Sequence, residues 1–170
     1  MSEKIEIMWE GRFITAKREG KWEYVSRSRG IKAAVILAID DGHVLLVEQF
    51  RVPLGKNCIE LPAGLVGDHD DHAEEDSTIA AIRELEEETG YRANVMKNLG
   101  EFYSSPGMVS ESFSLFRAEG LTKTGEGGGV DGENITVHRV PLQALGDFID
   151  NKRQEGAGID VKLMMFLKLI

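Results

Sequence analysis

The sequence has few of the features that mark secreted or membrane proteins. Cysteine occurs once in 170 residues, as Cys58, which excludes an intrachain disulfide framework, and we expect this thiol to be buried. The most apolar stretch, Leu163–Ile170, is far too short to span a bilayer. The first six residues lack the apolar run of a signal peptide. We therefore expect a cytoplasmic protein that does not enter a membrane.

Clusters of basic residues are missing as well. The chain carries 20 Lys and Arg against 29 Asp and Glu, a net charge of −9, with no run of basic residues, so we expect no direct binding to nucleic acid. An acidic protein can still bind phosphate groups if metal ions mediate the contact. The length and the 42% hydrophobic content fit one domain, residues 1–170, with a sizeable core.

The predicted elements are mixed in type. A strand buried on both faces is predicted at residues 31–39, and Asp41-Gly42 joins it to a return strand at 43–51. Short strands and turns are predicted over residues 1–24, which should pack on the main domain or on a partner subunit. Further strands are predicted at 58–61, 98–102, 111–117 and 135–140, and helices at 142–154 and 161–169. The last helix is apolar nearly all round and should be largely buried. Without βαβ alternation, the fold class is α+β, an α/β/α sandwich with a mixed β-sheet.

A glutamate-rich segment predicts a further helix with two different faces. Asp76 or Ser77 can cap its first turn, and Gly90 can take the left-handed conformation that ends a helix. One apolar stripe recurs at a spacing of three residues: Ile79, Ile82 and Leu85. Three carboxylates share the face that points away from this stripe: Glu84, Glu87 and Glu88. The small residues Ala80 and Ala81 flank that face and should let a ligand approach closely.

The three carboxylates favour a metal site. Like charges within one helical turn repel each other, and a bound cation removes that cost. A set of oxygen ligands suits Mg²⁺ or Mn²⁺, which are hard ions that also take up phosphate oxygens. The alternative is a solvated acidic face on an ordinary amphipathic helix. The fixed order of residues over 83–91, Arg-Glu-Leu-Glu-Glu-Glu-Thr-Gly-Tyr, argues against it.

That order resembles the Nudix box, whose pattern is G-x5-E-x7-R-E-U-x-E-E-x-G-U, where U is a bulky apolar residue. Glu75 stands at the required distance before Arg83, but ten residues rather than five separate it from Gly64. We interpret the excess as a five-residue insertion within 66–74. The chain is similar to Nudix hydrolases, and the resemblance implies the Nudix α/β/α sandwich.

The resemblance also implies roles for particular residues. It makes Glu84, Glu87 and Glu88 metal ligands, together with the backbone carbonyl of Ala63, which lies in Leu61-Pro62-Ala63-Gly64. It places Arg83 among the catalytic residues. A carboxylate in the glycine-rich loop 124–132 or directly after it would activate the attacking water, with Glu133 as first choice and Asp131 as second.

Three segments resemble substrate-binding parts of nucleotide-sugar hydrolases in this family. Ser105, Pro106 and Gly107 form a turn, in which Pro106 lies sixteen residues after Gly90, the offset associated with cleavage of ADP-ribose. The resemblance assigns Arg51 to the diphosphate. It assigns base stacking and ligand binding, often across a dimer interface, to three residues near the start of the chain: Trp22, Glu23 and Arg27. The alternatives are a surface role for Arg51 and a core position for Trp22.

The function implied is Mg²⁺-dependent hydrolysis of a nucleoside diphosphate sugar by a homodimer. ADP-ribose, cleaved to AMP and ribose 5-phosphate, is the first candidate, and a GDP-mannose hydrolase is the second. A different class stays open, a sensor that binds ADP-ribose without cleaving it, and so does an acidic scaffold domain. Within the insertion, His69-Asp70-Asp71-His72 could hold zinc, but a solvated acidic loop is favoured.

Overall fold

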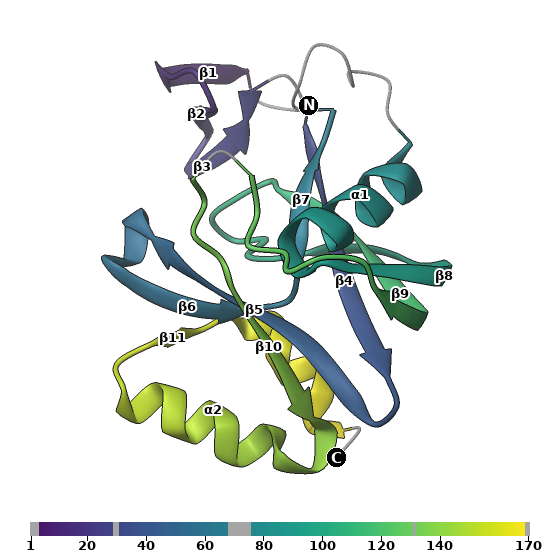
Figure 1. Ribbon diagram of the computed structural model, residues 1–170. Helices are drawn as coiled ribbons and strands as arrows, with labels where there is room; N and C mark the ends of the chain where they lie inside the picture. The colour runs from purple at the N-terminus through teal and green to yellow at the C-terminus, as the bar shows by residue number, and fades with distance from the viewer. Residues whose placement is uncertain (1–3, 29–30, 68–75, 131, 169–170) are drawn as a thin grey trace.

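The computed structural model describes residues 4–28, 31–67, 76–130 and 132–168. Its two sheets differ in size (Figure 1). The small antiparallel sheet has the order β1-β2-β3, with β1 at Ile5–Glu10, β2 at Ile14–Glu19 and β3 at Trp22–Arg27. Residues 1–24 were predicted to form strands and turns, and this is confirmed for the part that the structure describes.

The large sheet runs β11-β6-β5-β4-β9-β8, with β10 added on β5 and β7 on β4. Its strands are β4 Lys32–Asp40, β5 His43–Arg51, β6 Lys56–Glu60, β7 Ala63–Val66, β8 Tyr91–Tyr103, β9 Ser112–Lys123, β10 Thr136–Pro141 and β11 Gly158–Ile159. Most pairs are antiparallel, but β4–β9 and β6–β11 are parallel, so the sheet is mixed as predicted.

The helices cover the large sheet on different sides (Figure 1). Helix α1, Ser77–Thr89, packs on β4 and β9 over one core cluster that contains Ile36, Leu85 and Phe116. Helix α2, Leu145–Gln154, follows a 3-10 turn at Leu142–Ala144 and packs on a second cluster. The predicted α+β class is therefore confirmed. No helix among the described residues is long and apolar enough to cross a membrane.

The local predictions hold best where one turn or one apolar run decides the structure. Asp41 and Gly42 have φ values of 46° and 66°, as the predicted hairpin requires. Residues 34–38 of β4 are buried on both faces of the strand. Cys58 is buried, and burial raises the pKa of its thiol to about 11, with Glu60 adding to the effect.

The last helix differs from its prediction. Residues Val161–Lys168 form a 3-10 helix, and Val161 and Met164 are 64% and 47% exposed, while Leu163 is fully buried. A 3-10 helix has three residues per turn, so a single row of side chains can face the core. The prediction also missed the strands β7 and β11. Both are short, and they are defined by their pairing with β4 and β6 rather than by a local pattern.

Candidate functional site

A polar cavity of about 460 Å³ opens between the two sheets beside α1. Its wall combines acidic and basic side chains from segments far apart in the sequence. The charged residues of this wall are Arg27, Arg51, Glu60, Glu84, Glu88, Glu111, Glu133 and Lys162. The structure therefore brings together residues that were predicted separately as metal, diphosphate and water-activating groups.

Helix α1 has the predicted ends but a different rotation. Asp76 caps it by accepting a hydrogen bond of 2.8 Å from the backbone amide of Thr78, and Gly90 ends it with φ of 72°. Ala80 and Ala81, expected beside an open face, are fully buried, whereas Ile79 is 59% exposed. The expected free space beside the alanines was therefore wrong. Small side chains let the helix pack close to the sheet, and this contact turns the acidic face toward β7.

Glu88 is the most buried carboxylate of the cavity. It is 6% exposed, and its Oε2 accepts a hydrogen bond of 3.0 Å from the backbone amide of Ala63. Burial raises the pKa of Glu88 to about 8, and the charges of Glu84 and Glu133 act in the same direction, while the Ala63 amide opposes them. A bound cation would stabilise the ionised form of such a carboxylate.

Glu84 reaches the cavity because position 64 has no side chain. A Cβ atom on Gly64 would lie 1.8 Å from Cδ of Glu84, so any other residue would displace the carboxylate. Arg83 bridges Glu84 and Glu87 with ion pairs of 2.9 Å each. Arg83 thus orients one carboxylate toward the cavity, and Glu87 does not line it.

The donors present fit a hard cation in type. In the described residues no three His, Cys, Asp or Glu side chains stand close enough to enclose an ion as they are. Two carboxylates of α1, those of Glu84 and Glu88, nevertheless line the same cavity as Ala63 and Gly64. The deep burial of the Glu88 carboxylate is the observation that favours a cation here, because an ionised group in that position needs a compensating charge.

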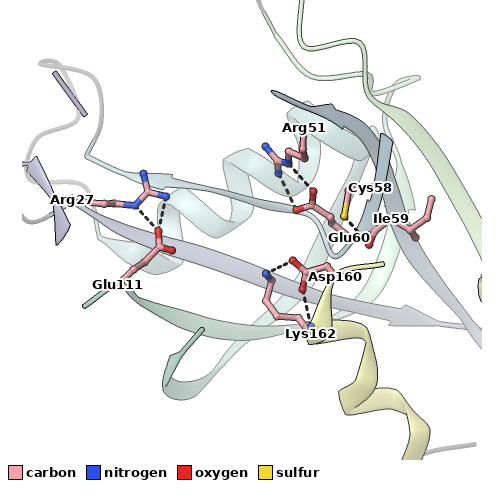
Figure 2. A network of polar contacts seen from close by, with 8 residues as sticks. All are labelled: Arg27, Arg51, Cys58, Ile59, Glu60, Glu111, Asp160 and Lys162. Atoms are coloured by element: carbon pink, nitrogen blue, oxygen red, sulfur yellow. Dashed lines mark hydrogen bonds and ion pairs between the residues drawn. The ribbon is translucent and has the colours of Figure 1, made fainter. Parts of the chain in front are cut away.

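Each basic residue of the cavity is held by its own carboxylate (Figure 2). Arg51 donates two hydrogen bonds to Glu60, at 2.6 and 2.9 Å. The other two pairs are Arg27–Glu111 at 2.5 Å and Lys162–Asp160 at 2.6 Å. Such pairs fix the guanidinium and ammonium groups in advance, which suits the binding of a charged phosphate chain.

Three residues of these pairs line the cavity but were not predicted as site residues from the sequence: Glu60, Glu111 and Lys162. Glu60 and Glu111 stand beside predicted segments, but no local pattern marks them. Lys162 is one of the few charged residues in the apolar C-terminal segment, which was a usable signal. Its ammonium group lies 5.7 Å from the ring centre of Phe113, in the cavity wall.

Several predicted substrate residues lie outside the cavity wall. Trp22 is 59% exposed and Glu23 is also exposed, so the alternative of a core position for Trp22 is wrong. Ser105 makes the predicted turn, because its carbonyl accepts hydrogen bonds from Met108 and Val109. Neither Ser105 nor the following Pro106 and Gly107 line the cavity, but the adjacent Ser104 does.

Glu133 lines the cavity, whereas Asp131 falls outside the described residues. The Glu133 side chain accepts a hydrogen bond of 3.0 Å from the backbone amide of Val130. Its charge contributes to the raised pKa of Glu88, so the two carboxylates share one site. Glu75 and the predicted loop cluster of residues 69–72 also fall outside the described residues.

Comparison with known proteins finds a family model and related sequences. The model of the NUDIX domain matches residues 29–161. The chain is 38% identical over 111 residues to ADP-ribose pyrophosphatase of Bacillus subtilis (strain 168), which covers 65% of this chain and 57% of that protein. It is 34% identical over 169 residues to GDP-mannose pyrophosphatase of Cronobacter sakazakii (strain ATCC BAA-894), with 94% and 80% covered.

A solved structure described as an ADP compounds hydrolase superposes with a TM-score of 0.73 at 20% identity, covering 99% of this chain and 91% of that one. At this identity the likeness shows the fold. The family match spans well over half of the sequence. The chain therefore belongs to the Nudix family.

Proposed function

We propose that the protein hydrolyses the diphosphate bond of a nucleoside diphosphate sugar with the help of Mg²⁺. The single observation that carries the proposal is that carboxylates of α1 and basic side chains of other elements line the same cavity. Glu84 and Glu88 come from α1, and Arg27, Arg51 and Lys162 supply cations from other elements. A cation bound by the carboxylates would neutralise part of the negative charge of a diphosphate bound by the arginines.

Glu84, Glu88 and the backbone at Ala63 would hold the metal, with Glu87 acting through water or by a change of rotamer. Nudix hydrolases generally use a divalent metal ion, which would neutralise the diphosphate and favour attack by water. Arg51 and Arg27 orient the diphosphate, and Arg83 keeps Glu84 in place. Glu133 accepts the proton of the attacking water, and Asp131 is the second candidate for this role.

ADP-ribose is our first substrate, cleaved to AMP and ribose 5-phosphate. The name of the Bacillus relative and the Pro106 turn support it. GDP-mannose is the second candidate because the Cronobacter relative aligns over nearly the whole chain. The alternative of a sensor that binds without cleaving is disfavoured by the intact pair of Glu84 and Glu88.

We further propose a cytoplasmic homodimer in which the exposed Trp22 of one subunit stacks on the base bound by the other. The exposed apolar side chains of the small sheet support an interface between copies, among them Ile5, Ile7, Trp9 and Phe13. A second subunit would explain why Trp22 lies outside the cavity of its own chain.

The deciding experiment incubates the protein with a panel of nucleotide sugars and Mg²⁺ and resolves the products by chromatography. We expect AMP and ribose 5-phosphate from ADP-ribose, and no products after chelation of the metal. Faster cleavage of GDP-mannose would select the second candidate. Tight binding of ADP-ribose without any product would select the sensor.

A further inference from the structure

The glycine-rich segment Gly127–Gly129 is packed on the last turn of α1. The backbone amide of Gly128 donates to the carbonyl of Glu88 at 2.9 Å, and that of Gly129 donates to the carbonyl of Glu87 at 3.1 Å. The last carbonyls of a helix have no partner within the helix itself. The loop that leads to Glu133 therefore caps the helix that carries Glu84 and Glu88.

Gly127 stands at the closest point of this contact. A Cβ atom there would lie 2.4 Å from the carbonyl carbon of Thr89 and 2.5 Å from the carbonyl oxygen of Glu88, both rigid backbone atoms. The φ value of Gly127 is +68°, a left-handed conformation that side chains disfavour. Both the space and the backbone conformation thus require glycine at this position.

The segment is tied on its other side to the strand that follows. The carbonyl of Gly128 accepts a hydrogen bond of 3.1 Å from the amide of Ile135, next to the start of β10. Gly128 is therefore bonded to α1 by its amide and to the end of the loop by its carbonyl. Glu133 lies in the short span between Gly129 and Ile135, so both ends of that span are anchored.

We propose that Gly127 is a positioning residue that fixes Glu133 relative to the carboxylates of α1. In this arrangement the backbone contact between Gly127–Gly129 and the last turn of α1 sets the separation of helix and loop. The inference rests on the proposed function, because it assumes that Glu133 serves the reaction at the α1 carboxylates.

The test is Gly127→Ala in the full chain, with kcat, KM and Tm measured on the best nucleotide sugar. The added methyl group requires a shift of roughly 1 Å to reach ordinary contact. A misplacement of that size in an active site costs about a hundredfold in rate. We expect kcat to fall by about that factor while KM changes little, because Arg27 and Arg51 lie on other elements.

Two matched control variants distinguish the displacement of Glu133 from a general loss of protein stability. Gly125→Ala lies in the same loop, where φ is not left-handed and a Cβ would meet nothing within 4 Å. Gly42→Ala has a φ of +66° in the β4–β5 turn and also meets nothing within 4 Å, so it carries the same backbone strain far from the cavity. We expect wild-type kcat from both, with a lowered Tm for Gly42→Ala alone.

Wild-type kcat in Gly127→Ala would overturn the proposal, and so would an equal loss of kcat in Gly42→Ala. If Gly127→Ala fails to fold, amide hydrogen exchange of the wild-type protein decides. The amides of Gly128 and Gly129 should then be protected as well as the last turn of α1, and fast exchange would refute the contact. If no nucleotide sugar is cleaved by wild type, the proposed function fails, whereas the exchange result still tests the contact.

Discussion

The backbone amide of Ala63 donates a hydrogen bond of 3.0 Å to Oε2 of Glu88. This bond joins the first residue of β7 to the last turn of α1, two segments separated by the insertion and most of the helix. It orients a deeply buried carboxylate whose pKa burial raises to about 8. The metal ligands that we propose are thus positioned by tertiary contacts, and the following predictions test their roles.

Glu88→Gln keeps the shape of the side chain and removes its charge. We expect kcat to fall by at least about a hundredfold, as for loss of a group that stabilises charge in the transition state. Steady-state kinetics at saturating Mg²⁺ measure the effect. Glu86→Gln, on the same helix but outside the cavity wall, is the control and should behave as wild type. Near-normal turnover of Glu88→Gln would contradict the assignment of Glu88 as a metal ligand.

Glu133→Gln tests the proposed base. A general base contributes typically about 10²–10⁴-fold, so we expect kcat to fall within that range with KM little changed. Asp131→Asn should lose much less, because Asp131 has a shorter side chain and stands two residues further from Ile135 in the sequence than Glu133 does. A larger loss in Asp131→Asn would transfer the role to Asp131. Small losses in both would mean that water is activated without either carboxylate.

Deletion of residues 1–20 tests the proposed dimer. We expect monomers by light scattering and much weaker substrate binding, because this deletion removes β1 and β2 entirely. Trp22→Ala in the full chain is the matched variant, and it should stay dimeric while KM rises. A full-length protein that is monomeric and fully active would refute the model.

Shortening the insertion between Gly64 and Glu75 by five residues tests whether it takes part in the chemistry. Its acidic and histidine residues have the composition of a solvated loop. Among the described residues, those that line the cavity lie outside 66–74, so we expect kcat to stay within about tenfold of wild type. Loss of activity in a variant with an unchanged circular dichroism spectrum would show that the loop contributes a ligand or a lid.

We expect ionised Glu48 to contribute to the stability of the folded protein, and we expect this contribution to be lost in acid. Burial acts to raise the pKa of this carboxyl, but hydrogen bonds from Lys152, Asn57 and His138 outweigh it and lower the pKa to about 2. Because the pKa of Glu48 is lower in the folded state than in the unfolded state, its ionised form stabilises the folded protein at pH values above 4.5, the ordinary pKa of a glutamate. This contribution is lost as the pH falls from 4.5 toward 2.

The measurement compares the Tm of wild type and Glu48→Gln between pH 7 and pH 2. We expect the difference to be constant down to about pH 5 and then to shrink steadily, because protonated Glu48 no longer attracts Lys152. The comparison cancels the titration of groups that do not contact Glu48. A difference that does not shrink in acid would contradict the prediction.

Local patterns in the sequence determined the elements that depend on neighbouring residues. Asp76 and Gly90 set the ends of α1 by capping, and Asp41-Gly42 set a hairpin through its turn conformation. The spacing of Glu84 and Glu88 put both carboxylates on one helix face, whatever the helix packs against. The order of residues 83–91 was enough to identify the family, because its acidic residues and its helix end are contiguous in the sequence.

Only the tertiary structure decided which residues meet. The contact of Ala81 with the sheet fixed the rotation of α1, whereas the sequence had suggested that the alanines face open space. Lys162 and Glu111 enter the cavity from distant segments, and no periodicity can report such a contact. The close contact of Gly127 with Thr89 is between backbone atoms. Patterns of side chains along the sequence indicate local structure, but the distances between separate segments are set only when the core packs.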